Sequence, residues 1–341
     1  MTRTTPPRPA DIVAAFPQLA PLARTATRLH PRPGPVTPHD SSIGGPLLWP
    51  ASERWPHCDG KHEPGFDPPM SVSDARLLHR IEADSYGRTR TTDEANTVDR
   101  LHGYRLRHGD RAVQAARSDI PQEPLAMLPI AQLYARDVPS LRPPEGKDLL
   151  QVLWCPFGHD SELVLRTQLF WRDSREVTDV LVEQPEPAVV QFEGFVPNVC
   201  QLHPEIVTEF PREGIDPALV VALEDWSTAQ EYEDTEESFY WSQLSTAPGC
   251  KVGGWTRWSR TDPFPMLCAE CGARMDPLLT IASDEWGSSG YSWIPVEDRE
   301  ENGGHRYASQ AATGLQFNDL DDVQLVICSV DPTHPHTSHR P

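Results

Sequence analysis

The chain contains the same ordered series of landmarks twice, 209 positions apart when counted from Gly45 to Gly254. Each copy begins with a Gly-Gly pair, passes through tryptophans and a proline, and reaches a cysteine. The first copy comprises Ser42-Ile43-Gly44-Gly45, Trp49, Trp55-Pro56 and Cys58, and the second comprises Lys251-Val252-Gly253-Gly254, Trp255, Trp258, Phe264-Pro265 and Cys268. Self-similarity of this kind predicts a fold made of two related halves.

Each half then continues in the same way. An apolar phrase follows the cysteine, at 125–132 and at 278–283. A strand-like run follows, which ends in a cysteine with a histidine just beyond it: Leu149–Cys155 with His159, and Val323–Cys328 with His334. With 36 prolines spread along the chain, short strands and turns are favoured over long helices. We therefore expect a β-rich α+β fold, an internally duplicated two-lobed unit with antiparallel sheets.

The pattern divides the chain into five segments: an N-terminal tail and helix (1–40), a first repeat lobe (41–215), an acidic helical connector (216–248), a second repeat lobe (249–335) and a tail (336–341). The N-terminal helix is predicted from apolar residues at helical spacing within the segment from Pro9 to about Leu29, although Pro17 and Pro21 would break or kink it. The connector begins at Asp216-Pro217 and continues into the acidic run 231–237.

Residues 62–121 interrupt the first lobe where the second lobe has only a few residues. The insertion should contain two helices, one from about Ser73 and one from Thr91, where Thr91 and Glu94 have the spacing of a capping box. It is rich in arginine: Arg76, Arg80, Arg88, Arg90, Arg100, Arg105, Arg107, Arg111 and Arg117. We expect a solvated helical excursion that is dispensable for folding; a functional lid or docking element is the alternative.

Charge and hydropathy narrow the classes of function. The formal net charge of −20 disfavours nonspecific binding to nucleic acids or to anionic membranes and suits a basic protein partner. No stretch approaches the ~18–20 apolar residues of a membrane span, and the N-terminus lacks the apolar region of a signal peptide. We therefore expect a cytoplasmic protein with reduced cysteines, and reduced cysteines grouped with histidines point to metal rather than to disulfides.

The stronger candidate metal site lies in the second half. Cys268 and Cys271 are spaced as a thiolate pair followed by Gly272, and Cys328 and His334 supply a second pair. Three cysteines and one histidine form a recognised structural zinc set. Two alternatives are reduced cysteines without metal and a redox pair at Cys268 and Cys271. His336 and His339 are competing ligands near the end of the chain.

A weaker candidate site lies in the first half. Cys58 with His62, and Cys155 with His159, could form a site with two cysteines and two histidines. The alternative is a degenerate copy that has lost its metal. Because four protein ligands leave no open position for substrate, both sites would be structural rather than catalytic.

The sequence lacks the familiar catalytic signatures. It contains no GxSxG, no phosphate-binding Walker loop, no GxGxxG after a strand and no HExxH. The repeated Gly pairs could seat an anion, but a tight turn or close backbone packing is the more economical interpretation. The sequence therefore indicates no particular catalytic residues.

Several phrases resemble the YwqG-like bacterial proteins, which contain a domain of unknown function. The resemblance rests on Ser-x-Ile-Gly-Gly-Pro with a following Trp-Pro, on Ile130-Ala131-Gln132, on Lys251-Val-Gly-Gly-Trp, and on the Leu-Leu-Thr-Ile phrase at 278–281. It runs from about Asp40 to His334 and implies an internally duplicated, β-rich unit. It implies no activity and no catalytic residues, and the insertion 62–121 departs from its pattern.

Two classes of function remain. The first is a noncatalytic, zinc-stabilised binding or interaction protein, for which neutralisation of a basic toxin would suit the acidic charge. The second is an enzyme, a hydrolase acting in the cleft between the two lobes. Acidic charge without a catalytic constellation favours the first class.

Overall fold

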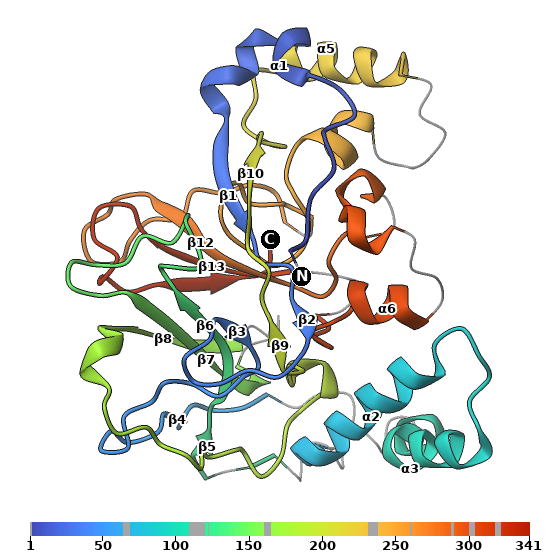
Figure 1. Ribbon diagram of the computed structural model, residues 1–341, viewed down its shortest axis with the longest axis vertical. Coiled ribbons are helices and arrows are strands. Elements are labelled where there is room, and N and C mark those ends of the chain that lie inside the picture. The colour runs from blue at the N-terminus through green and yellow to red at the C-terminus, as the bar shows by residue number, and fades with distance from the viewer. Residues whose placement is uncertain are drawn as a thin grey trace.

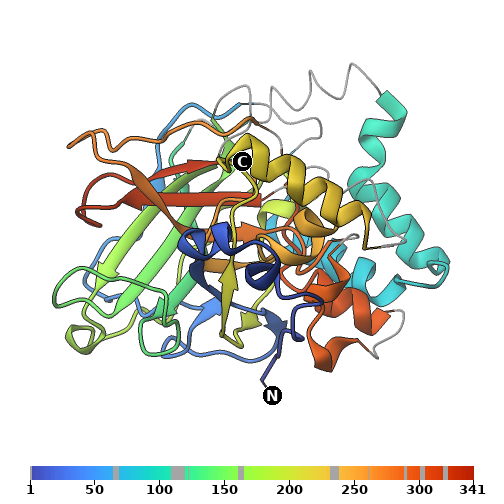
Figure 2. The same ribbon diagram turned by 90° about the horizontal axis from the view of Figure 1, so that it is seen from above.

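The fold consists of two six-stranded antiparallel sheets and a small two-stranded sheet, with most of the helices on one side (Figures 1 and 2). This computed structural model describes residues 2–63, 69–108, 120–121, 123–159, 165–230, 238–259, 261–287, 290–299, 304–317 and 322–341. The strands are β1 Arg24–Arg28, β2 Arg32–Pro33, β3 Ser42–Ile43, β4 His57–Cys58, β5 Leu125–Ala126, β6 Leu128–Tyr134, β7 Leu149–Gly158, β8 Leu165–Arg172, β9 Cys200–Gln201, β10 Glu205–Glu209, β11 Lys251–Gly253, β12 Met275–Ala282, β13 Asp322–Cys328 and β14 Thr337–His339. The predicted α+β class with antiparallel sheets is confirmed.

The first sheet has the strand order β2-β9-β3-β6-β7-β8, and the second sheet has the order β10-β1-β11-β12-β13-β14. Four strands of each sheet pair in the same sequence and register. The β6–β7 ladder shifts register between Pro129 and Ala131, and the β12–β13 ladder shifts between Pro277 and Leu279. Aligning these two prolines also aligns the pairs Gln132↔Gln151 and Thr280↔Gln324. The two sheets therefore correspond residue by residue across these strands.

The correspondence extends to the cysteines that precede β6 and β12. The Met127 N–H donates to the Pro56 carbonyl at 3.0 Å, and the Met275 N–H donates to the Met266 carbonyl at 3.0 Å. Each of these carbonyls lies two residues before a cysteine, Cys58 in one half and Cys268 in the other. The two cysteines thus have matching strand surroundings.

At one end of each sheet, consecutive strands of the chain belong to different sheets. β1 lies in the second sheet and β2 in the first, whereas β9 lies in the first sheet and β10 in the second. β1 pairs with both β10 and β11, and β9 pairs with both β2 and β3. The sheets thus cut across the predicted segments: segment 1–40 supplies β1 to the second sheet, and residues 205–209 of the expected first lobe belong to that same sheet.

The N-terminal helix is also shorter than expected. It comprises α1 Ile12–Ala15, capped by Asp11, and the 3₁₀ helix η1 Pro17–Leu22. Pro17 and Pro21 limit helical hydrogen bonding here, and the β-branched Thr25 and Thr27 then favour the strand β1. The preceding residues are held in place, since the Thr5 N–H donates to the Glu205 carboxylate at 2.8 Å.

The main core lies between the sheets and belongs to both halves. Leu150, Val152 and Trp154 of β7 point into it, and so do Val323, Leu325 and Ile327 of β13. Side chains alternate along a strand, so the other face of β7 carries Leu153 and Cys155, and the other face of β13 carries Val326 and Cys328. Both outer faces are covered by smaller apolar clusters, which explains why all ten residues of β7 are buried.

The remaining helices are α2 Val72–Ser85, α3 Thr92–His108, α5 Pro217–Thr228 and α6 Gly304–Gln310, the 3₁₀ helices η2 Ser174–Glu176, η3 Glu193–Phe195, η5 Tyr291–Trp293 and η6 Val296–Asp298, and the π-helical turn η4 Tyr240–Leu244. The capping box before α3 is confirmed, because the Thr91 N–H donates to Glu94 at 2.7 Å and the Glu94 N–H donates to Thr91 at 3.3 Å. α5 begins as expected after Asp216, whose carboxylate accepts from the Ala218 N–H. None of the described helices is both long and apolar enough to cross a lipid bilayer.

The insertion is not a solvated excursion throughout, because Val72, Ala75 and Leu78 of α2 belong to the main core. The expected C-terminal tail 336–341 forms β14, which pairs with β13. The acidic run 231–237 and two of the arginines in the insertion, Arg111 and Arg117, lie outside the described residues.

The core position of α2 reverses the expectation that the insertion is dispensable for folding. A deletion of 64–120 would remove Met70, Val72, Ala75 and Leu78, all of which are buried in the main core. Loss of several buried apolar side chains destabilises a domain by a few kcal/mol for each large one.

Gly254, the second glycine of the second Gly-Gly pair, is required by close packing. Gly254 has φ +75°, and a Cβ placed there would lie 2.8 Å from the Ala26 Cβ and would overlap the Glu209 carboxylate. That carboxylate is buried and accepts hydrogen bonds from Lys251 Nζ at 2.6 Å and from the Trp255 N–H at 2.8 Å. Close packing, rather than an anion site, therefore explains this glycine.

Replacing Gly254 by alanine should destabilise the fold by about 2–4 kcal/mol, since overpacking adds to left-handed backbone strain. Gly214→Ala is the matched control, because Gly214 has φ +71° with no atom near its Cβ position. It should cost only the strain, about 1 kcal/mol. Urea denaturation of both variants measures the difference; equal midpoints would contradict the packing argument.

Candidate metal centres

The structure brings both sequence-predicted ligand sets together. One set is Cys58, His62, Cys155 and His159, and the other is Cys268, Cys271, Cys328 and His334. In each set the four ligand atoms all lie within 4.8 Å of one another. Because the residues of each set come from distant parts of the chain, their convergence is produced by the fold and not by local sequence.

The centre in the second half lies at the end of β13. The Cys271 and Cys328 Sγ atoms are 3.4 Å apart, and the Cys268 Sγ lies 3.6 Å from His334 Nδ1. Cys268 and Cys328 are buried, whereas Cys271 is exposed. The centre is therefore reached from solvent on the Cys271 side.

A tight turn at Cys268–Gly272 directs backbone N–H groups towards sulfur. The Gly272 N–H donates to the Cys268 carbonyl at 2.9 Å, and Gly272 has φ +69°, which a side chain would disfavour. Backbone N–H groups of Cys271 and Glu270 lower the pKa of the Cys268 thiol, and those of Asp331 and Val330 lower the pKa of the Cys328 thiol. The turns thus favour thiolates, the form that binds metal.

Two carboxylates lie on the far side of the His334 ring. Its Nε2 lies 3.7 Å from a Glu270 carboxylate oxygen and 3.8 Å from one of Asp331. This places Nδ1, the nitrogen nearer the sulfurs, in position to act as the ligand. Outer carboxylates of this kind orient metal-binding histidines.

The centre in the first half lies at the end of β7. The Cys58 Sγ is 3.5 Å from His159 Nε2, and the Cys155 Sγ is 3.4 Å from His62 Nε2. Cys58, Cys155 and His62 are buried and His159 is half-buried. Hydrogen bonding between the two thiols lowers the pKa of Cys58 and, together with burial, raises the pKa of Cys155.

Backbone carbonyls orient both histidines of this centre. His62 Nδ1 lies 3.3 Å from the Pro121 carbonyl, and His159 Nδ1 lies 2.9 Å from the Lys61 carbonyl. A carbonyl can only accept a hydrogen bond, so Nδ1 must carry the proton in each ring. In the neutral rings, the Nε2 lone pairs are therefore free to face the cysteines.

Both donor sets fit zinc. With Zn–S of ~2.3 Å and Zn–N of ~2.0–2.1 Å, neighbouring ligands of a tetrahedron lie about 3.5–3.8 Å apart. The closest ligand atoms in the two centres are 3.4–3.6 Å apart. Thiolate and imidazole donors suit zinc better than they suit magnesium or calcium.

Comparison with known proteins gives no match: no family model fits the chain, and no curated protein is significantly similar to it. The YwqG-like resemblance accordingly stays a prediction.

The competing ligands lie elsewhere. His336 Nε2 is hydrogen-bonded to the Thr167 hydroxyl at 2.8 Å, and His339 packs against Trp258 with ring centroids 5.5 Å apart. Cys200 and Cys250 lie in the main core between the sheets, where burial raises the pKa of Cys200 to about 12. These two core cysteines are thus separate from Cys58, Cys155, Cys268 and Cys328, which belong to the outer apolar clusters.

A buried charge cluster at the strand crossing was not foreseen. His30 Nδ1 lies 2.6 Å from Glu285, His30 Nε2 lies 3.3 Å from Glu205, and the Arg28 guanidinium donates to Glu285 at 3.2 Å. Burial opposes ionisation of Glu285, yet His30 and Arg28 hold its pKa below the usual value. His30 has φ 44°, a strained value for a residue with a side chain. No local signal marks these residues, since their partners lie up to 257 positions away.

The two centres should show opposite histidine tautomers when loaded with zinc. His62 and His159 should be protonated at Nδ1 and bind through Nε2, whereas His334 should be protonated at Nε2 and bind through Nδ1. Long-range ¹H–¹⁵N correlation spectra of ¹⁵N-histidine-labelled protein measure this, with His62→Gln, His159→Gln and His334→Gln used for assignment. The same tautomer at all three histidines would contradict the assigned geometry.

Proposed function

We propose that the protein is a noncatalytic, zinc-stabilised binding or interaction protein that holds two structural zinc ions. The observation that supports this is the convergence of two four-ligand sets, Cys58, His62, Cys155 and His159, and Cys268, Cys271, Cys328 and His334. Four protein ligands complete a tetrahedron, whereas a catalytic zinc keeps one position for water or substrate. The zinc ions would therefore contribute folding free energy.

The charge of the chain supports a basic protein as the partner. A net charge of −20 gives a long-range attraction for a cationic surface, and a basic toxin is one such partner. Seven free cysteines, most of them buried, support a reducing compartment such as the cytoplasm.

We also propose that the two halves arose by internal duplication. The support is the shared order of β3-β6-β7-β8 and β11-β12-β13-β14, the bulges after Pro129 and Pro277, and the matching positions of Cys58 and Cys268. The metal centres then occupy corresponding places, with His62 in one half where Cys271 stands in the other.

One observation favours the alternative, a hydrolase acting between the lobes. A cavity of about 540 Å³ lies there and is lined by Glu82, Asp284 and His79 among other residues. Carboxyl and imidazole groups in a cavity are the usual components of acid–base catalysis. A screen with chromogenic ester, amide and glycoside substrates tests this, and Asp284→Asn must abolish any turnover that is assigned to the site.

Purified protein should contain two equivalents of zinc per chain. Cys271→Ser should leave one equivalent and lower the melting temperature by several degrees, because binding free energy becomes folding free energy. Cys271 is exposed, so this substitution removes a ligand without opening a core cavity. Plasma emission spectrometry and thermal melts provide the measurements.

Cys200→Ser is the matched control. The Cys200 thiol donates to the Ala312 carbonyl at 3.3 Å, a bond that a serine hydroxyl can replace. Two equivalents of zinc should remain in this variant. Absence of zinc from the wild type, together with an unchanged melt for Cys271→Ser, would refute the structural zinc.

A basic partner should be retained by the immobilised protein at ~50 mM salt and released at ~500 mM, since screening weakens attraction between exposed charges. Mass spectrometry of the material eluted from a lysate of the native host identifies it. Only acidic or neutral proteins in that eluate would contradict the electrostatic argument.

A further inference from the structure

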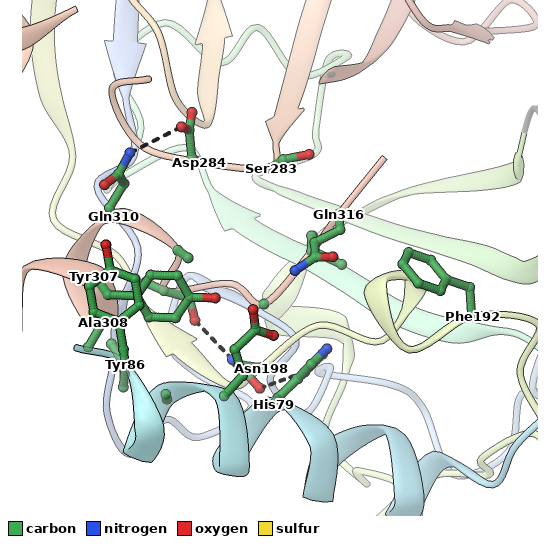
Figure 3. Close-up of a pocket in the computed structure, with 17 residues that line it drawn as sticks. His79, Tyr86, Phe192, Asn198, Ser283, Asp284, Tyr307, Ala308, Gln310 and Gln316 are labelled. Carbon is green, nitrogen blue, oxygen red and sulfur yellow. Dashed lines mark hydrogen bonds between the residues drawn. The ribbon is translucent and has the colours of Figure 1, made fainter. Parts of the chain in front are cut away.

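The cavity between the two halves is lined by segments from both. α2 of the insertion forms one wall, and α6 with the residues that follow it forms the opposite wall (Figure 3). Further lining residues are Ser283 and Asp284 directly after β12, Phe192 and Asn198 on either side of η3, and Pro33 of β2. Its volume of about 540 Å³ is in the range of pockets that hold small organic ligands.

Aromatic rings lie at the two ends of this cavity. Tyr86 of the insertion and Tyr307 of α6 stack with centroids 4.2 Å apart and planes at 15°, and Phe192 lies at the opposite end (Figure 3). The faces of such rings carry partial negative charge, so they attract cations as well as apolar groups.

Two carboxyl groups also line the cavity. The Asp284 carboxylate accepts one hydrogen bond from Gln310 Nε2 at 3.3 Å, as Figure 3 shows, and Glu82 is hydrogen-bonded to the Tyr307 hydroxyl. Among the described residues of the lining there is no lysine or arginine. The described wall therefore carries negative charge without a matching cation.

His79 does not supply that cation. Its Nδ1 lies 3.2 Å from Asn198 Oδ1, while Asn198 Nδ2 donates to the Ala312 carbonyl at 3.2 Å. The amide is thereby oriented with its oxygen towards the ring, so His79 donates through Nδ1. Burial lowers the pKa of His79, which keeps the ring neutral near pH 7.

Asp284 is in an unfavourable position for an ionised carboxylate. Burial raises its pKa, and the opposing attraction of Arg257 comes from a residue outside the lining. The hydrogen bonds to Asp284 come from neutral groups, the Gln310 amide and the Gly287 backbone, so a half-buried carboxylate in this position gains from a charged donor brought next to it. A ligand cation would supply that donor.

We propose that this cavity binds a small organic cation, a protonated amine that pairs with Asp284 and Glu82 and carries an apolar body against the aromatic rings. The proposal concerns a ligand site separate from the zinc centres and does not depend on them. The expected preference is for amines over neutral and anionic molecules of the same shape.

Three indole compounds that differ only in the side-chain terminus test this preference: tryptamine, tryptophol and indole-3-propionate. Isothermal titration of the full-length, zinc-loaded protein near pH 7 should show saturable binding of tryptamine. Tryptophol should bind about tenfold more weakly, because it lacks the charge-assisted hydrogen bond, and indole-3-propionate more weakly still. No saturable binding of tryptamine, or equal affinity for all three compounds, would overturn the proposal.

Two variants locate the binding. Asp284→Asn keeps the shape of the side chain and should weaken tryptamine about tenfold. Asp262→Asn, at an exposed residue outside the cavity lining, is its matched control and should change nothing. Unchanged tryptamine affinity in Asp284→Asn would overturn the proposal.

Ala308→Phe tests whether the amine binds in the cavity without altering its charge. It provides the test of the proposal if Asp284→Asn fails to fold. Ala308 lines the cavity from α6, so a phenylalanine there should fill the space and abolish binding. An unchanged melting temperature shows that the variant is folded. Full tryptamine affinity in folded Ala308→Phe would place the amine elsewhere and overturn the proposal.

Discussion

The alternation of side chains along β7 and β13 is the constraint on which the rest of the structure depends. One face of each strand must build the core between the sheets, which Val152 and Leu325 do. The opposite face then carries Cys155 and Cys328 outwards, beneath small apolar clusters that also contain Cys58 and Cys268. A shift of one residue in either strand would exchange core residues for metal ligands, so packing and ligand placement fix the same register.

The first centre also ties the insertion to the sheet. His62 stands at the start of the insertion and contacts the carbonyl of Pro121 at its end, while His159 contacts the carbonyl of Lys61 just before it. A zinc ion bound by these histidines would close the base of a segment whose helix α2 packs in the main core and lines the cavity. The metal centre and the cavity wall are thus joined by one stretch of chain.

The ligand sets could be predicted from the sequence because the repeated landmarks give their order, and a cysteine that ends an apolar run is a local signal. The capping box at Thr91 and the start of α5 at Asp216 are equally local. The strand identity of 24–28 could not be predicted, since it depends on pairing with Glu205–Glu209 and Lys251–Gly253. Likewise, the helical period of α2 gave its apolar face but not the core against which it packs, and nothing near His30 marks Glu285 as its partner.

The crossing of β1 and β10 has a consequence for how the chain leaves the ribosome. β1 ends at Arg28, but its neighbour β11 begins at Lys251, 223 positions later. β10, the other partner of β1 in the second sheet, begins at Glu205, 177 positions after Arg28, so at ~5–20 residues per second β1 has no partner for about 9–35 s and is paired on one side only until β11 is made. The nascent chain therefore exposes an unpaired strand until more than half of it has been synthesised, and a holding chaperone would have its longest opportunity to bind there.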